Sequence, residues 1–115
     1  MSANEVVETF FALDAKDIPR ATQFYVSAFG ASVSFSSADW ASLHVAGVRI
    51  GLARSADYRG SRTGLHFAVR DLGAACSRVE SAGGAVENAP TEVAPGVVIS
   101  IVRDTEGTVF TLVQR

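Results

Sequence analysis

Three titratable side chains of this chain could carry proton-transfer chemistry. Asp14, His44 and His66 each fall on a stretch of alternating apolar residues that predicts a strand. A carboxylate or imidazole within hydrogen-bond reach of a bound substrate can act as a general acid or base. The three lie on three different predicted strands without the spacing of a metal motif, so a metal site made of them is disfavoured. The alternative roles are a solvated carboxylate at a strand end and histidines hydrogen-bonded within a sheet.

A second group of side chains could hold a ligand rather than react with it. Trp40 is the single tryptophan, and its ring could stack on a planar molecule or lie under a partner subunit. Arg49 could pair with an anionic group, although a solvated or ion-paired arginine is the more common case. The residues predicted to bind a ligand are Phe10, Trp40, Ser42, His44, Arg49, His66 and Thr111.

These residues are positioned by two copies of one pattern. Each copy has a strand, an Asp that can cap a helix, and an amphipathic helix that ends near glycine. Asp17 corresponds to Asp71 and Gly30 to Gly84, both at a separation of 54 (71−17 and 84−30). The apolar period then changes to 2, which predicts strands at 31–37, 39–46 and 48–54, and again at 85–90, 96–103 and 107–114.

The pattern predicts an α+β fold made of two βαβββ units that form a curved mixed sheet around a cleft. The units span 6–54 and 64–114, with a linker at 55–63, in a single domain of residues 1–115. One side of the strands is uniformly apolar, and we expect it to pack on the helices as core. The opposite, concave side mixes small, aromatic and polar residues, as small-molecule pockets do. The residues predicted as core are Phe11, Leu13, Leu43, Val45, Ile50, Leu52, Leu65, Phe67, Val69, Phe110 and Leu112.

Composition excludes several partners. The net charge is −2, and no cluster of Lys or Arg provides the basic surface that nucleic acid requires. No apolar stretch approaches membrane-spanning length, so no membrane partner is expected. The single cysteine, Cys76, cannot form an internal disulfide and falls inside a predicted helix, where a buried side chain is expected. These features indicate a cytoplasmic protein.

Three segments resemble a known superfamily. "ALDAKDIPRATQFYVSAFGASV", "LHFAVRDL" and "VRDTEGTVFTLVQ" are similar to the glyoxalase, bleomycin-resistance and extradiol-dioxygenase proteins, also called vicinal-oxygen-chelate proteins. The resemblance implies their fold and, in the enzymes, a divalent metal held by His or Glu at four positions. Here those positions carry Phe10, Gly51, Gly64 and Thr111, which are poor metal ligands. His66 lies two residues after the position of the family histidine. We therefore expect neither a metal nor another cofactor.

The resemblance then implies the metal-free branch, in which homodimers sequester an antibiotic or another planar metabolite in their clefts. We expect metal-independent binding of a small planar or partly apolar molecule, and no metal-dependent glyoxalase or dioxygenase activity. The alternative is a metal-independent isomerase, cyclase or lyase that uses Asp14, His44 or His66 for proton transfer. A subunit with a purely structural role is the third possibility.

Overall fold

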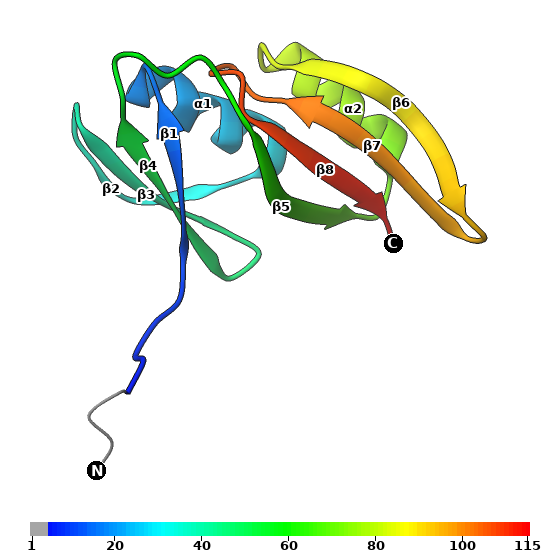
Figure 1. Ribbon diagram of the computed structural model, residues 1–115, viewed down its shortest axis with the longest axis horizontal. Coiled ribbons are helices and arrows are strands. Elements are labelled where there is room, and N and C mark those ends of the chain that lie inside the picture. Colours follow the sequence, from blue (N-terminus) through cyan, green and yellow to red (C-terminus); the bar gives the residue numbers. More distant parts are fainter. Residues whose placement is uncertain (1–4) are drawn as a thin grey trace.

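The computed structural model describes residues 5–115, which form two βαβββ units placed side by side (Figure 1). The strand order is β1-β4-β3-β2 in the N-terminal sheet and β5-β8-β7-β6 in the C-terminal sheet. The α+β fold with a repeated βαβββ pattern is thus confirmed, with one sheet per unit. The N-terminal unit contains β1 (Phe11–Ala15), α1 (Ile18–Phe29), β2 (Ser32–Ser36), β3 (Trp40–Val45) and β4 (Val48–Arg54). The C-terminal unit contains β5 (Arg62–Val69), α2 (Leu72–Ser81), β6 (Ala85–Ala94), β7 (Val97–Arg103) and β8 (Val109–Gln114).

Both helices begin at the predicted aspartates. Asp17 accepts a hydrogen bond from the backbone N–H of Arg20 at 3.0 Å, and Asp71 accepts one from Ala74 at 3.0 Å. Each carboxylate satisfies one of the N–H groups that a first helical turn leaves without a partner. Gly30 ends α1 in the left-handed conformation, with φ of 67°. Local sequence signals therefore set the start of both helices and the end of α1.

The core lies between the helices and the inner faces of the two sheets. Ile18, Tyr25, Leu43, Leu52 and Leu112 are fully buried there. An aromatic cluster joins the units, because the Phe29 ring of α1 lies 4.8 Å from Phe67 of β5 and 5.8 Å from Phe110 of β8. Edge-to-face contacts of this kind stabilise beyond the area they bury. The two units consequently share one hydrophobic core.

In the second unit, the predicted end of β6 and the predicted start of β5 differ from the structure. β6 was expected to end at residue 90 but continues through Pro90 to Ala94, with several register shifts against β7. Proline is tolerated because β6 is an edge strand, where a missing N–H breaks no ladder bond on the open side. β5 begins at Arg62 rather than 64, so the linker is shorter than predicted.

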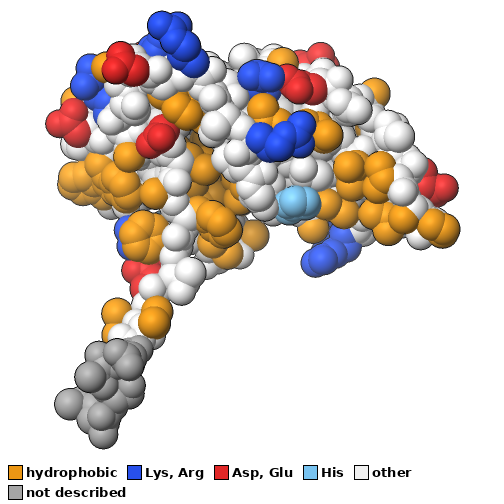
Figure 2. Space-filling model, viewed as in Figure 1, with side chains coloured by type: hydrophobic (Ala, Val, Ile, Leu, Met, Phe, Trp, Pro, Cys, Tyr) orange, Lys and Arg blue, Asp and Glu red, His pale blue; other side chains and the backbone are white. Residues whose placement is uncertain are grey.

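The first unit begins with an extended arm. A leading strand was predicted from residue 6, but the ladder with β4 begins at Phe11, so residues 5–10 precede the sheet. This arm projects from the body, and Figure 2 shows apolar side chains exposed on it and at its base. Val7 is 90% exposed, and Phe11, predicted to be core, is 51% exposed. The prediction for Phe11 is wrong because the strand leaves the helix layer at this residue.

Within residues 5–115, neither helix is long and apolar enough to cross a membrane.

Candidate functional site

The N-terminal sheet has one face that is turned away from the helices, and several predicted site residues share it. β3 and β4 run antiparallel, with Ser42 opposite Gly51 and His44 opposite Arg49. Because side chains alternate along a strand, these residues and Trp40 project on the same side. We call this surface the N-terminal open face, defined by Trp40, Ser42, His44, Arg49 and Gly51.

The Trp40 indole lies over Gly51. A Cβ atom on residue 51 would come within 3.0 Å of the Trp40 ring atoms Cη2 and Cζ2, closer than real Cβ contacts. Glycine is therefore required for the ring to occupy this place. The indole Nε1 donates to the Ser42 hydroxyl at 2.9 Å, which fixes the orientation of the ring in its plane. The open face thus has a preformed aromatic surface rather than a mobile tryptophan.

Arg49 lies beside this aromatic surface and holds the arm. Its Nε and Nη2 donate to the two carboxylate oxygens of Glu8, both at 2.9 Å. The Phe10 ring stacks on the guanidinium, with its centroid 3.6 Å from Cζ. Arg49 Nη1 also reaches the Ser42 hydroxyl at 3.4 Å. The hydrogen bonds from Arg49 lower the pKa of Glu8 below its ordinary value, so the pair is charged at neutral pH.

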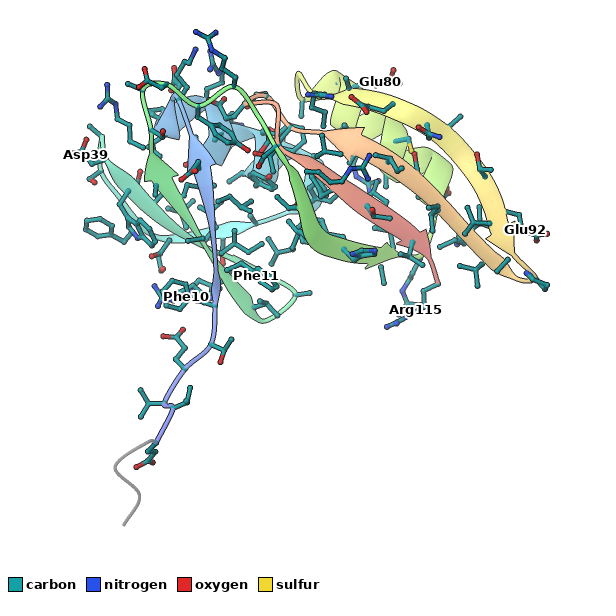
Figure 3. All side chains as sticks on the ribbon, in the orientation of Figure 1. Phe10, Phe11, Asp39, Glu80, Glu92 and Arg115 are labelled. Atoms are coloured by element: carbon teal, nitrogen blue, oxygen red, sulfur yellow. The ribbon has the colours of Figure 1, made fainter. Side chains whose placement is uncertain are left out.

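Phe10 and Phe11 point to opposite sides of the chain (Figure 3). Phe10 joins Arg49 on the open face, whereas Phe11 lines the space between the two units. Strand alternation explains this division, and the sequence had placed both residues on these sides. The arm therefore contributes one aromatic ring to each of two surfaces.

The candidate proton-transfer residues of the N-terminal sheet lie far apart. Asp14 pairs with Ala53, which in turn pairs with Trp40 at the start of β3. His44 is four residues further along β3, a separation of about 13 Å at the rise of a strand. Its Nε2 is 3.2 Å from the Ser34 hydroxyl. The two groups consequently do not reach a common atom.

The remaining predicted residues lie on the other sheet. His66 pairs with Thr111 between β5 and β8. The His66 ring is exposed, and its Nδ1 is 2.9 Å from the carbonyl oxygen of Gly64. The structure therefore brings together Phe10, Trp40, Ser42, His44 and Arg49, and places His66 and Thr111 on the C-terminal sheet.

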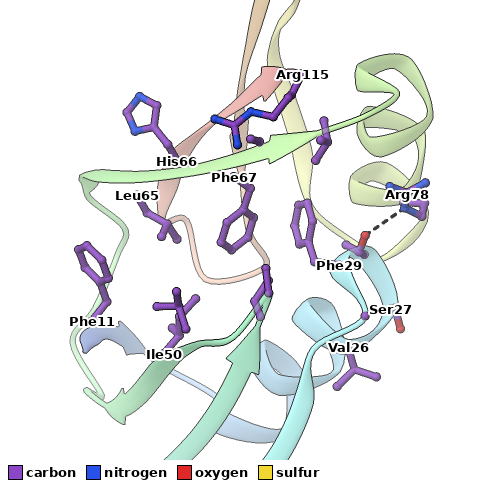
Figure 4. A pocket seen from close by; sticks show the side chains of 17 residues that line it. Phe11, Val26, Ser27, Phe29, Ile50, Leu65, His66, Phe67, Arg78 and Arg115 are labelled. Carbon is purple, nitrogen blue, oxygen red and sulfur yellow. Dashed lines mark hydrogen bonds between the residues drawn. The ribbon is translucent and has the colours of Figure 1, made fainter. Parts of the chain in front are cut away.

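A second hollow, the inter-unit cavity, lies between the two units on the helix side of the strands. Its volume is about 710 Å³, and its lining includes Phe29, Ile50, Leu65 and Phe67. Figure 4 shows Leu65 and Phe67 pointing into it, whereas His66, between them on β5, points away. The sequence had predicted Leu65 and Phe67 as core. Of the predicted ligand-binding residues, only His66 contributes to the lining, so the cavity is distinct from the N-terminal open face.

Two buried acids in the turn between β7 and β8, Asp104 and Glu106, join the units. The Tyr25 hydroxyl donates to Asp104 Oδ2 at 2.7 Å, and the other oxygen of Asp104 accepts from the backbone N–H of Glu106 and Thr108. Burial raises the pKa of Asp104, which the hydrogen bonds only partly offset. Burial also raises the pKa of Tyr25 well above its ordinary value of 10.0, and the Asp104 charge raises it further.

Glu106 accepts hydrogen bonds from the backbone just before α1. Its carboxylate accepts from the backbone N–H of Lys16 and Asp17, both at 2.9 Å, and from the Arg20 guanidinium at 2.8 and 3.0 Å. Burial alone would raise the pKa of Glu106, but these hydrogen bonds outweigh it and hold the pKa below 4.5. The equivalent turn of the first unit, "VAG" between β3 and β4, has no acid. The presence of two acids in only one copy was the sequence signal that could have pointed to Asp104 and Glu106.

Comparison with known proteins agrees with this fold. The family model described as "Glyoxalase-like domain" matches residues 10–113, and the chain therefore belongs to this family. A search of curated protein sequences finds no match.

Three solved structures are similar. A fosfomycin resistance protein, FosX, from Listeria monocytogenes superposes with a TM-score of 0.81 at 16% identity, over 96% of this chain and 94% of the other. A glyoxalase/bleomycin resistance protein/dioxygenase family enzyme from Burkholderia phytofirmans gives 0.78 at 21% identity, over 91% and 95%. The bleomycin-binding protein of Streptomyces verticillus, complexed with copper(II)-bleomycin, gives 0.67 at 21% identity, over 96% and 98%.

The four positions at which the family resemblance implies metal ligands do not fit a divalent ion. Gly51 lies under the Trp40 ring, and Phe10 stacks on Arg49. Gly64 has no side chain, and Thr111 supplies only a neutral hydroxyl. A divalent site needs several imidazole, thiolate or carboxylate donors at short range. Among residues 5–115, no group of three His, Cys, Asp or Glu side chains is placed to hold a metal ion.

Proposed function

We propose that this chain binds a small planar or partly apolar molecule on the N-terminal open face, without a metal ion. The observation that carries the proposal is the placement of the Trp40 indole over Gly51, with its Nε1 bonded to Ser42. A ring that is already oriented loses little conformational freedom when a planar ligand stacks on it. Ser42 and Arg49 add polar groups beside this surface, as specific small-molecule sites require.

We further propose that the ligand is an antibiotic or a related planar metabolite and that binding sequesters it. Support comes from similar folds whose names include bleomycin binding and fosfomycin resistance. Metal-independent isomerase, cyclase or lyase chemistry has less support, because Asp14 and His44 lie at distant points of one sheet and His66 lies on the other. A thermal-shift screen of planar antibiotics and metabolites would identify candidate ligands.

A cytoplasmic homodimer is the form in which we propose that the protein acts. The leading strands β1 and β5 are free sheet edges, and the arm exposes Val6, Val7 and Phe10. A free sheet edge is a template for pairing with another chain, and exposed apolar patches mark interaction sites. The single thiol, Cys76, is buried and free, which suits a reducing compartment. Light scattering at micromolar concentration should give the mass of two chains, and the mass of one would contradict the dimer.

Replacement of Trp40 tests the proposed function. A stacked planar ligand should quench or shift the fluorescence of the only tryptophan. Trp40→Ala should weaken ligand binding by about tenfold or more, since loss of the stacked ring costs on the order of 1 kcal/mol beyond area burial. Sedimentation should show that the variant keeps its oligomeric state. Unchanged affinity in an intact assembly would refute a role for Trp40 in ligand stacking.

A further inference from the structure

We propose that Arg49 and Ser42 form a carboxylate-binding site, that the ligand of the open face is an aromatic carboxylate, and that Glu8 and Phe10 of the arm occupy its place in the free chain. This inference rests on the proposed function, because it names the chemical class of the ligand for the same surface. The arm then acts as an internal competitor, with Glu8 in place of the ligand carboxylate.

The geometry around Arg49 is that of carboxylate recognition. Two nitrogens of the guanidinium meet the two oxygens of Glu8 in parallel hydrogen bonds of 2.9 Å. This forked arrangement matches a planar carboxylate and is shorter and stronger than a contact between neutral groups. The Glu8 carboxylate therefore shows where the carboxylate of a ligand would bind.

Ser42 supplies an independent indication of a ligand. Its hydroxyl oxygen accepts from Trp40 Nε1 at 2.9 Å and from Arg49 Nη1 at 3.4 Å, and the residue is only 6% exposed. A hydroxyl also has one proton to donate. No acceptor for that proton is found in the part of the chain from residue 5 to residue 115. A buried donor without an acceptor is costly, and a ligand oxygen beside Arg49 would satisfy it.

The aromatic part of the proposed ligand follows from the rings on either side of this pair. The Trp40 indole donates a hydrogen bond to the Ser42 hydroxyl, and the Phe10 ring stacks on the guanidinium of Arg49. A carboxylate on Arg49 that carries an aromatic ring would direct the ring toward the Trp40 surface. Phe10 shows that the flat side of the guanidinium also accepts an aromatic group.

The contact between the arm and Arg49 is weak enough to be displaced. The Glu8 side chain is 50% exposed and that of Arg49 is 25% exposed. Ion pairs at such exposed positions contribute little net stability, because water and salt screen them. A ligand that offers both a carboxylate and a ring that stacks on Trp40 gains contacts that Glu8 lacks, so it should replace the arm.

Two matched probes measure separately how much the carboxylate and the aromatic ring contribute to binding affinity. Binding of 2-naphthoate and of its neutral analogue 2-naphthamide should be measured by isothermal titration calorimetry on the full-length protein. Naphthoate should bind the wild type more tightly than the amide. Glu8→Gln should tighten naphthoate binding about threefold or more and leave the amide unchanged, because the internal competitor loses its charge. Arg49→Gln should weaken naphthoate about tenfold and abolish the preference for the acid.

A matched control is available on the other sheet. Glu87→Gln neutralises a carboxylate that pairs with Arg103, far from the open face, and should leave both affinities unchanged. Equal binding of both probes that depends on Trp40, with no effect of Glu8→Gln, would overturn the carboxylate site and leave the proposed function intact. If neither these two probes nor the screened planar ligands bind, the proposed function fails and this inference fails with it.

Discussion

The Tyr25 hydroxyl donates a buried hydrogen bond of 2.7 Å to Asp104, joining the first helix to the turn between the last two strands, 79 residues later in the chain. Both partners are buried, and the Tyr25 hydroxyl depends on Asp104 for its polar contact, whereas Asp104 also accepts from the backbone N–H groups of Glu106 and Thr108. Because the contact crosses between the units, it stabilises their relative placement as well as each unit.

The stability of the protein at alkaline pH should depend on the hydrogen bond between Tyr25 and Asp104. The pKa of Tyr25 in the folded state lies well above 10.0, so the hydroxyl contributes stability that is complete below pH 10 and is lost as the pH rises toward the folded-state pKa. Tyr25→Phe should lower the unfolding free energy at neutral pH by about 1–2 kcal/mol and should flatten its decline above pH 10. Urea unfolding at a series of pH values measures both effects. Tyr58→Phe is the control, and an equally flattened decline in that variant would contradict the assignment to Tyr25.

Glu106 should stabilise the folded protein at neutral pH and lose this effect in acid. Its pKa is lowered in the folded state, so its contribution is present above pH 4.5 and is lost as the pH falls through the folded-state pKa. Glu106→Gln should cost about 2 kcal/mol at neutral pH, and the difference from wild type should shrink in acid. Thermal unfolding between pH 3 and pH 7 would check this. Glu87→Gln removes an exposed ion pair and should cost about 1 kcal/mol or less at every pH.

Gly51 of β4 and Gly64 of β5 are the two glycines among the four family positions, but they should respond differently to a methyl group. Gly51→Ala forces the Trp40 ring from its place, which should cost about 1–3 kcal/mol and shift tryptophan emission to longer wavelength. Nothing lies within 4 Å of a Cβ on Gly64, so Gly64→Ala should leave emission unchanged. Fluorescence spectra and denaturant unfolding of the two variants test this contrast. Identical spectra for wild type and Gly51→Ala would refute the packing of Trp40 on Gly51.

Divalent metals should not stabilise the protein. The residues at the four family positions offer one hydroxyl and no charged donor, so we expect nickel, zinc, manganese and iron(II) to leave the melting temperature unchanged. Elemental analysis of protein purified without chelator should find far less than one ion per chain. One tightly bound ion per chain would contradict the metal-independent proposal.

Local features of the fold could be predicted from sequence because their signals lie within a few residues. The Asp17 and Asp71 caps and the glycine at the end of α1 are of this kind, and the structure confirms them. The end of β6 could not be predicted, because only its place at a sheet edge allows Pro90 within the strand. Phe11 has the apolar period of a core residue, but no local signal shows that the strand leaves the helix layer there, which leaves the residue 51% exposed.

For the candidate site, the face of each side chain followed from alternation, but the contacts between side chains did not. Trp40, Ser42 and Arg49 were assigned to one side of the sheet, as the structure shows. The pairing of Arg49 with Glu8 joins residues 41 positions apart and has no sequence signal. The inter-unit cavity was missed for a similar reason, because apolar residues that line a hollow have the same pattern as residues that fill a core.

The hydrogen bonds from Lys16 and Asp17 to Glu106 affect how the chain is made. During synthesis, α1 is complete at Phe29, 77 residues (106−29) before Glu106 has been translated. At about 5–20 residues per second, that delay is about 4–15 seconds. During that delay the Asp17 carboxylate can cap α1, but the backbone N–H groups of Lys16 and Asp17 lack the Glu106 acceptor. A gene that repeated the first unit twice would encode no acid at this turn, since its counterpart is "VAG". The two halves are similar in plan, but they are no longer interchangeable.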